Sequence, residues 1–192
     1  MLFFGRTLLA EEESPLDLVV LADIIPTLVI ELPYATPNNI TGKTLYYPGF
    51  KARLRRGVAL ELKAAQETLQ PMGYRLKVWD AWRPMSAQKA LYAVISDPRY
   101  VAEPGEAAMH NRGVAVDVTV VDAEGRELAM PTGFDVMTRE AHYHYRGKDP
   151  VIAKNLALLQ KVMKENGFYA CRTEWWHFFS RKWRAYPIMD IE

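Results

Sequence analysis

Residues 114–121 read VAVDVTVV and form the clearest β-strand pattern of the sequence. Four valines recur at every second position, which places them on one face of a strand (Val114, Val116, Val118 and Val120). Asp117 interrupts this hydrophobic run. A charged carboxylate in a buried strand is costly unless it is paired, protonated or bound to a cation. The stretch therefore predicts both a core strand and a side chain that needs a partner.

Further strands and helices are predicted on both sides of this strand. Strand patterns cover residues 27–32, 74–79 and 168–179. Helical patterns cover residues 52–69, 86–95 (with Ser86 as the N-cap) and Pro150–Glu165 (with Asp149 as the N-cap and Asn166-Gly167 as the stop). Residues 33–49 are predicted to be a long loop. Because no regular βαβ order appears, we expect an α+β fold with a central, largely antiparallel sheet flanked by helices.

The composition of the 192-residue chain excludes several classes of protein. Lys and Arg number 24 against 23 Asp and Glu, so the net charge of +1 offers no cationic surplus for nucleic acid. The hydrophobic fraction of 49% is too high for a disordered chain. No apolar run reaches the ~18 residues that a membrane helix needs. We expect a single domain over residues 1–192, of which 1–26 form an N-terminal segment, with no nucleic-acid or membrane partner.

The first residues do not match a secretory signal, which needs a basic start, an apolar stretch of ~7–15 residues and a small-residue cleavage site. In residues 1–10, MLFFGRTLLA, Arg6 interrupts the apolar residues, and three glutamates follow directly. We expect a cytoplasmic protein, with a periplasmic one as the alternative. The single cysteine, Cys171, excludes an internal disulfide and is interpreted as a core thiol.

Two short motifs carry potential chemistry. His110 precedes Asp117, and Gly113 between them can supply the bend that brings both side chains together. A plain His–Asp hydrogen bond is the alternative. Residues 174–177 read EWWH, where packing of an aromatic strand is the alternative to a site formed by Glu174 and His177. Together the motifs offer two histidines and an aspartate as ligands of one catalytic Zn²⁺ at the sheet edge, and a glutamate left for proton transfer.

A third element follows the strand predicted over residues 74–79. Residues 80–84 read DAWRP, and Pro84 favours an extended conformation for Arg83 at the end of the strand. A guanidinium fixed beside a zinc ion would stabilise the oxyanion that forms when water attacks an amide. The alternative is a surface arginine paired with Asp80, which would contribute little.

These motifs resemble those of the D-alanyl-D-alanine dipeptidases, zinc metallopeptidases that include the vancomycin-resistance dipeptidase. The resemblance runs from about residue 32 to residue 186. The family pattern Ser-x-His-x-x-Gly-x-Ala-x-Asp corresponds to residues 108–117, with Ala108 in place of the serine, and Glu-x-x-His corresponds to residues 174–177. Residues 79–84 are similar to the arginine segment of the family. Residues 34–36 with Asn39, Thr41, Gly42 and Lys43 are similar to its N-terminal loop.

The resemblance implies a role for each site residue. Zinc would be bound by three ligands (His110, Asp117 and His177). Glu174 would act as general base and acid, and Arg83 would stabilise the transition state. Asp135 would bind the free ammonium group of the substrate, while Tyr34 and one of Tyr46 or Tyr47 would line the pocket. Ala108 lacks a hydroxyl that contacts substrate in the family, which affects preference and rate. His142 and His144 are interpreted as structural.

The implied reaction is zinc-dependent hydrolysis of the D-alanyl-D-alanine dipeptide to free D-alanine by metal-activated water, with a small dipeptide as the partner. One alternative is a D,D- or L,D-carboxypeptidase that acts on longer peptidoglycan stem peptides. A second is a non-catalytic binder of cell-wall peptides, and the presence of both Glu174 and Arg83 argues against it.

Overall fold

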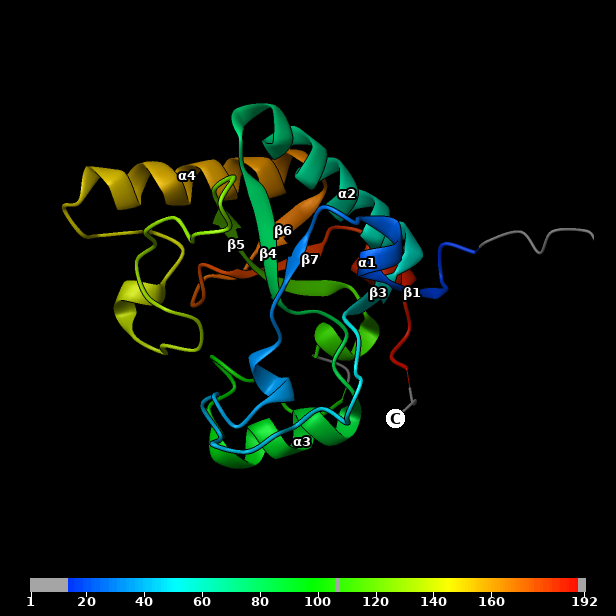
Figure 1. Ribbon diagram of the computed structural model, residues 1–192. Helices are drawn as coiled ribbons and strands as arrows, with labels where there is room; N and C mark the ends of the chain where they lie inside the picture. Colours follow the sequence, from blue (N-terminus) through cyan, green and yellow to red (C-terminus); the bar gives the residue numbers. More distant parts are fainter. Residues whose placement is uncertain (1–13, 106–107, 190–192) are drawn as a thin grey trace, which may run out of the picture.

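Strand β5 lies at the centre of a five-stranded sheet (Figure 1). The computed structural model describes residues 14–105 and 108–189, so residues 1–10, on which the expected cytoplasmic location rests, lie outside the described part. The sheet has the order β2-β4-β5-β7-β6 (Val29–Ile30, Arg75–Asp80, Ala115–Val121, His177–Ser180 and Phe168–Ala170). Strands β2 and β4 pair in parallel, and the other neighbours are antiparallel. This confirms the expected α+β fold with a largely antiparallel sheet.

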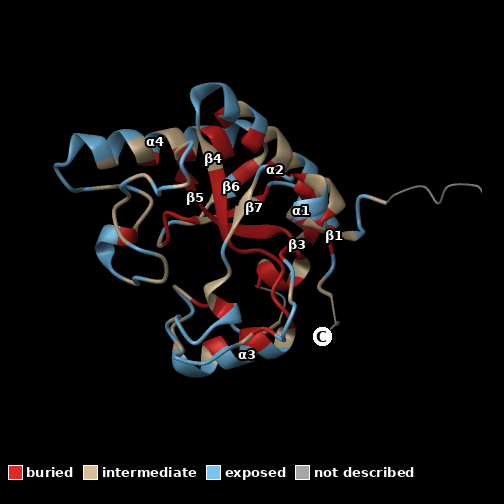
Figure 2. Cartoon of the chain, viewed as in Figure 1, coloured by how far each residue is buried: buried red, intermediate tan, exposed pale blue. Residues whose placement is uncertain are grey.

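Helices α2 (Arg56–Leu69) and α4 (Pro150–Glu165) lie together at the top of Figure 1 and pack against the sheet. Their buried side chains join the alternate valines of β5 in one hydrophobic core, which Figure 2 shows in red. Each large aliphatic side chain buried in this way stabilises the fold by roughly 1.5–3 kcal/mol. Helix α4 starts where the sequence predicts, because the Asp149 carboxylate accepts hydrogen bonds from the N–H groups of Val151 and Ile152.

A second, smaller core lies at the other end of the molecule. Helix α3 (Met85–Val94) contributes Ala87 and Leu91, which pack with Tyr34, Tyr46 and Val101. In Figure 1 the helix lies at the bottom, beside the blue and cyan segment that connects β2 to β3 (Arg53–Arg55). This core supports the region where β4 ends, and β4 leads directly into the predicted arginine segment.

The remaining elements are short. Strand β1 (Leu18–Val20) pairs with β3 in a separate two-stranded sheet and leads into helix α1 (Leu21–Ile24). The described residues also contain short 3-10 turns outside the α-helices and strands (Pro33–Ala35, Gln70–Met72, His110–Arg112, Arg139–Ala141 and Trp183–Ala185). Among the described residues, no helix is long and apolar enough to cross a membrane.

A β-bulge changes the direction of side chains at the end of β4. Val78 pairs with Val118, but the next pair joins Asp80 to Asp117, so Trp79 is an extra residue on β4. Residues that pair across a sheet lie on the same face. The bulge therefore brings the Asp80 carboxylate to the face of the sheet that carries Asp117, opposite to the valines and helices.

Several predicted boundaries are wrong. The strand over residues 27–32 is reduced to Val29–Ile30, because Pro26 and Thr27 form a turn. The helix predicted from residue 52 begins at Arg56, since residues 53–55 pair with β1. Pro84, and not Ser86, is the N-cap of α3. The single strand predicted over residues 168–179 is two strands, which a turn separates so that β7 can fold back on β6.

Candidate active site

The three predicted metal ligands meet at one point. Asp117 and His177 are cross-strand partners on β5 and β7. His110 lies in the 3-10 turn His110–Arg112, and Gly113 after it has φ +69°, a left-handed conformation that favours glycine. A Cβ at Gly113 would also lie 3.0 Å from the Met189 side chain. The bend at this glycine brings His110 to the Asp117 face, and one ligand atom from each of the three residues lies within 4.8 Å of the others.

The two histidines present different ring nitrogens to this cluster. His110 Nδ1 lies 2.5 Å from the Ala81 carbonyl oxygen, so Nδ1 carries the hydrogen and donates, and Nε2 faces the cluster. His177 uses Nδ1, which lies 3.1 Å from His110 Nε2 and 2.9 Å from Asp117 Oδ1. Two imidazole nitrogens and a carboxylate oxygen on converging side chains are a donor set that fits zinc. The residues of the chain therefore fit the metal that the sequence implies.

The charge of Asp117 is favoured by its neighbours. Burial opposes ionisation of this carboxyl group, but the His110 and His177 rings hold its pKa well below the usual range. Asp117 is therefore a carboxylate, which answers the question raised by an acidic residue in a buried strand. It is paired with both histidines, as a metal ligand of that cluster would be.

Glu174 lies beside the cluster, ahead of β7. The turn that precedes the strand places Glu174 Oε2 3.9 Å from His177 Nδ1, although a regular strand would have separated the two side chains. Glu174 is 6% exposed. Burial and the nearby carboxylates of Asp117 and Asp135 raise its pKa well above the usual value. A carboxylate in this state readily accepts and returns a proton, as a general base and acid must.

Arg83 lies on the other side of the cavity and is buried. Its Nε and Nη2 donate hydrogen bonds of 2.9 and 2.7 Å to Asp80 Oδ2, and its Nη1 donates one of 2.8 Å to Gln88 Oε1. Burial opposes the charge, but the Asp80 carboxylate more than offsets this, and the pKa of Arg83 lies well above its usual value. The interpretation as a surface arginine is therefore wrong, although the pairing with Asp80 is present.

Asp135 and Tyr34 form a pair at a third side of the cavity. The Tyr34 hydroxyl donates a hydrogen bond of 2.8 Å to Asp135 Oδ2. Asp135 adopts φ +59°, a left-handed conformation that is uncommon for a residue other than glycine. Such conformations are concentrated at functional sites. Burial raises the pKa of its carboxyl group to about 7. The tyrosine hydrogen bond counteracts this effect, since it favours the charged form.

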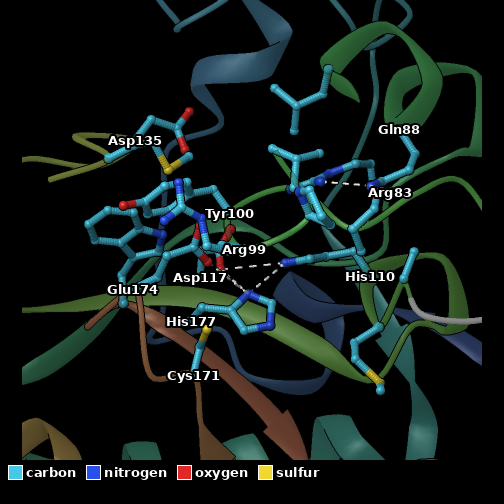
Figure 3. A pocket seen from close by; sticks show the side chains of 18 of the residues that line it. Arg83, Gln88, Arg99, Tyr100, His110, Asp117, Asp135, Cys171, Glu174 and His177 are labelled. Atoms are coloured by element: carbon cyan, nitrogen blue, oxygen red, sulfur yellow. Dashed lines mark hydrogen bonds and ion pairs between the residues drawn. The ribbon is translucent and has the colours of Figure 1, made fainter. Parts of the chain in front are cut away.

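All these groups line a single cavity of about 160 Å³ (Figure 3). The close-up shows Asp135 on one side, Arg83 with Gln88 on the other, and the three predicted ligands between them. The cavity lies where β4 ends and β7 begins, over the central strand of the sheet. It combines a candidate metal site, a proton acceptor, a fixed cation and an acidic group, and its volume suits a very small ligand.

Other predicted residues lie elsewhere. Tyr47 is 45% exposed, its hydroxyl accepts a hydrogen bond from Arg53, and it is not among the described residues that line the cavity, which corrects the prediction for it. Tyr46 is buried, its hydroxyl donates to Asp80, and it too is absent from the described residues that line the cavity, so neither tyrosine of the predicted pair lines it. His142 and His144 line a separate hollow.

Cys171 and Gln88 also line the cavity, where the sequence does not predict them. Cys171 is half-buried and lines the cavity, so its interpretation as a core thiol is wrong. The sequence does not indicate Gln88, because a glutamine in the first half of a predicted helix carries no signal by itself. Its position five residues after Arg83 becomes informative only once α3 turns back toward the end of β4.

Comparisons with known proteins show the family to which the chain belongs. Residues 14–187 match the model of the peptidase family described as D-ala-D-ala dipeptidase. A D-alanyl-D-alanine dipeptidase of Escherichia coli is 36% identical over 90% of this chain and 89% of that protein. One from Enterococcus faecalis is 31% identical over 76% of this chain and 82% of that protein.

Among solved structures, the chain is similar to a mutant of the vancomycin-resistance D,D-pentapeptidase VanY in complex with Zn(II), at 15% identity and a TM-score of 0.43, over 70% of this chain and 76% of that one. The family model covers nearly all the residues that the structure describes, and the curated relatives cover most of the chain. The protein therefore belongs to the D-Ala-D-Ala dipeptidase family of peptidases.

Proposed function

We propose that this protein is a zinc-dependent dipeptidase that hydrolyses D-alanyl-D-alanine to free D-alanine. One observation carries the proposal: the His110, Asp117 and His177 cluster and the acidic Asp135 line the same cavity of about 160 Å³. A dipeptide is small enough for such a space, and its ammonium group lies only a few bonds from its peptide carbonyl. The curated relatives named D-alanyl-D-alanine dipeptidases support the same substrate.

Each residue has a distinct task in this proposal. Asp135 binds the substrate ammonium, which fixes the peptide bond relative to the cluster. Glu174 accepts a proton from the attacking water as the water oxygen bonds to the carbonyl carbon, and gives that proton to the leaving amine as the carbon–nitrogen bond breaks. Arg83 stabilises the negative charge that develops on the carbonyl oxygen. Zinc bound by the cluster supplies a Lewis acid that activates the water and polarises the carbonyl.

The alternative is a carboxypeptidase that acts on longer stem peptides. A longer peptide has an uncharged amide where the dipeptide has its ammonium, so the half-buried Asp135 carboxylate would lack a cationic partner on the substrate. The left-handed backbone of Asp135 and its hydrogen bond to Tyr34 hold the carboxylate in place. These features favour the dipeptide.

The test is a direct comparison of substrates with the metal-loaded enzyme. We expect about one zinc per chain and hydrolysis of D-Ala-D-Ala, with kcat/KM at least about 100-fold lower for N-acetyl-D-Ala-D-Ala, which lacks the charged amine. L-Ala-L-Ala and a pentapeptide ending in D-Ala-D-Ala complete the panel. Faster cleavage of the pentapeptide than of the dipeptide would establish the carboxypeptidase instead, and zinc without any turnover would support a binding protein.

A further inference from the structure

The Asp80 carboxylate is fully buried and has both oxygens occupied. Oδ1 accepts hydrogen bonds from the Tyr46 hydroxyl and from the N–H of Ala81, the latter at 2.8 Å. Oδ2 accepts the two hydrogen bonds from Arg83. A carboxylate with four donors around it has a fixed rotamer. Asp80 is therefore a fixed hydrogen-bond acceptor for the Arg83 guanidinium.

Arg83 is restrained from two further directions. Gln88, which accepts from Nη1, is itself anchored, because its Nε2 donates a hydrogen bond of 2.6 Å to the Ala102 carbonyl. The Tyr34 ring lies 5.3 Å from the centre of the guanidinium, within the range of a cation–π contact. The side chain that faces the cavity is thus held by a carboxylate, an amide and an aromatic ring.

The same segment is joined to the predicted metal ligands. The Arg83 N–H donates a hydrogen bond of 3.2 Å to the His110 carbonyl, and Asn111 Nδ2 donates one of 2.6 Å to the Arg83 carbonyl. Asp80 pairs with Asp117 across the sheet because of the bulge at Trp79. The position of Arg83 is therefore set relative to the cluster and not only relative to helix α3, which begins two residues later.

We propose that Asp80 is the positioning residue of the active site: it holds the Arg83 guanidinium at the place where the carbonyl oxygen of the substrate becomes negative. This inference rests on the proposed function. Charge stabilisation is efficient when the donor is already oriented, since no reorganisation is then needed during the reaction. Asp80 also neutralises the charge of a buried arginine. One side chain therefore both fixes the position of the guanidinium and stabilises its charge away from water.

The first experiment compares Asp80→Asn with Gln66→Leu in the zinc-loaded enzyme. Gln66 is a matched control, because it is equally buried and bonds to β4 at Leu76, at the far end of that strand. We expect D80N to lower kcat about 100-fold, the effect of a misplacement of about 1 Å, with KM changed less than about 3-fold. Q66L should lose stability but keep kcat. A folded D80N enzyme with kcat within about 3-fold of wild type would overturn the proposal.

A double-mutant cycle separates positioning from a general structural role. Arg83→Lys keeps the positive charge but not the planar fork that Asp80 holds. If Asp80 acts through Arg83, the D80N/R83K enzyme has the same kcat as R83K within about 3-fold. Multiplied losses in the double mutant would show that Asp80 acts by another route and would refute the proposal.

Folding of D80N is checked by circular dichroism, since loss of the carboxylate leaves a buried charge. If D80N does not fold, Asp80→Glu retains the charge and displaces the carboxylate by one methylene. D80E should then lower kcat at least about 10-fold with unchanged zinc content, and an unchanged kcat would refute the proposal. Failure of the proposed function would give a different result, because the wild-type enzyme itself would then not hydrolyse the dipeptide.

Discussion

The hydroxyl of Tyr34 donates a 2.8 Å hydrogen bond to the Asp135 carboxylate, and the ring of the same tyrosine lies against the Arg83 guanidinium. Tyr34 thus connects the group proposed to bind the substrate ammonium with the group proposed to stabilise the transition state. The two contacts use different parts of the side chain. They can therefore be removed separately, and each should affect a different kinetic constant.

We expect Tyr34→Phe to raise KM for D-Ala-D-Ala about 2- to 10-fold, the value of one hydrogen bond, with little change in kcat. The phenyl ring remains under Arg83, whereas Asp135 loses the donor that favours its charged form. Tyr34→Leu removes the ring contact as well and should also lower kcat. Steady-state kinetics of the two variants provide the check, and equal effects of both on kcat would contradict the separation.

The affinity for substrate should depend on pH near neutrality. Burial raises the pKa of Asp135 to about 7, so below this pH an increasing share of the free enzyme carries the neutral acid, which cannot pair with an ammonium group. We expect kcat/KM to fall about tenfold per unit as the pH drops below 7. Asp135→Asn should lose this dependence together with most of the activity. A profile of D135N parallel to that of wild type would exclude Asp135 as its source.

The same carboxyl group makes stability depend on pH. Its pKa is higher in the folded protein than in the unfolded chain, so between about pH 4 and 7 the folded state binds more protons. This contribution favours the folded state fully at the acidic end and is lost as the pH rises through 7. Urea unfolding should show that the free energy of unfolding falls less between pH 5 and pH 8 in D135N, which lacks this carboxyl group, than in wild type.

Replacement of the proposed general base should separate turnover from metal binding. We expect Glu174→Gln to lower kcat by about 10²–10⁴-fold while zinc remains bound, because Glu174 lies beside the cluster without belonging to it. His177→Ala should lose both zinc and activity. Metal analysis of the purified variants distinguishes the two cases, and full activity of E174Q would exclude its proposed role.

Removal of the metal should destabilise the wild-type protein. Any ligand that binds the folded state alone stabilises it, and a concentration of 100 times Kd contributes about 2.7 kcal/mol. We expect a chelator to lower the Tm of the wild-type enzyme and leave the Tm of His177→Ala unchanged. A chelator that lowers both equally would indicate a second metal site or a direct effect on the chain.

The N-cap of α4 offers a test of the fold that does not involve the cavity. The Asp149 carboxylate accepts hydrogen bonds from the first turn of the helix, at 2.8 Å from the Val151 N–H. Asp149→Ala should reduce the free energy of unfolding by about 1 kcal/mol. Because the helix contacts the opposite face of the sheet from Asp117, kcat should stay unchanged.

Several parts of the site could be predicted from sequence because they depend on local patterns. His110, Asp117, Glu174, His177 and Arg83 lie in short motifs, and the structure brings all of them to one cavity. Gly113 signals the bend that allows His110 and Asp117 to meet, since only a residue without a Cβ adopts that conformation easily. The N-cap of α4 and its stop at Asn166-Gly167 are local in the same sense.

Other features could not be read from the chain. Tyr46 and Tyr47 are adjacent in a long loop, and nothing in their local sequence shows that Tyr46 is buried against Asp80 while Tyr47 faces solvent. The aromatic run over residues 168–179 resembles one continuous strand, but it contains the turn that aligns Glu174 with His177. Packing of distant segments decides both outcomes.

The sequence by itself determined the class of fold, the identity of the chemical groups and their order along the chain, because periodicity and motif spacing are properties of neighbouring residues. Only the tertiary structure decided how the groups face each other. The bulge at Trp79 turns Asp80 toward Asp117 and thereby anchors Arg83, and this depends on the register between β4 and β5. A register is a relation between two strands far apart in sequence, so no single stretch of the chain contains it.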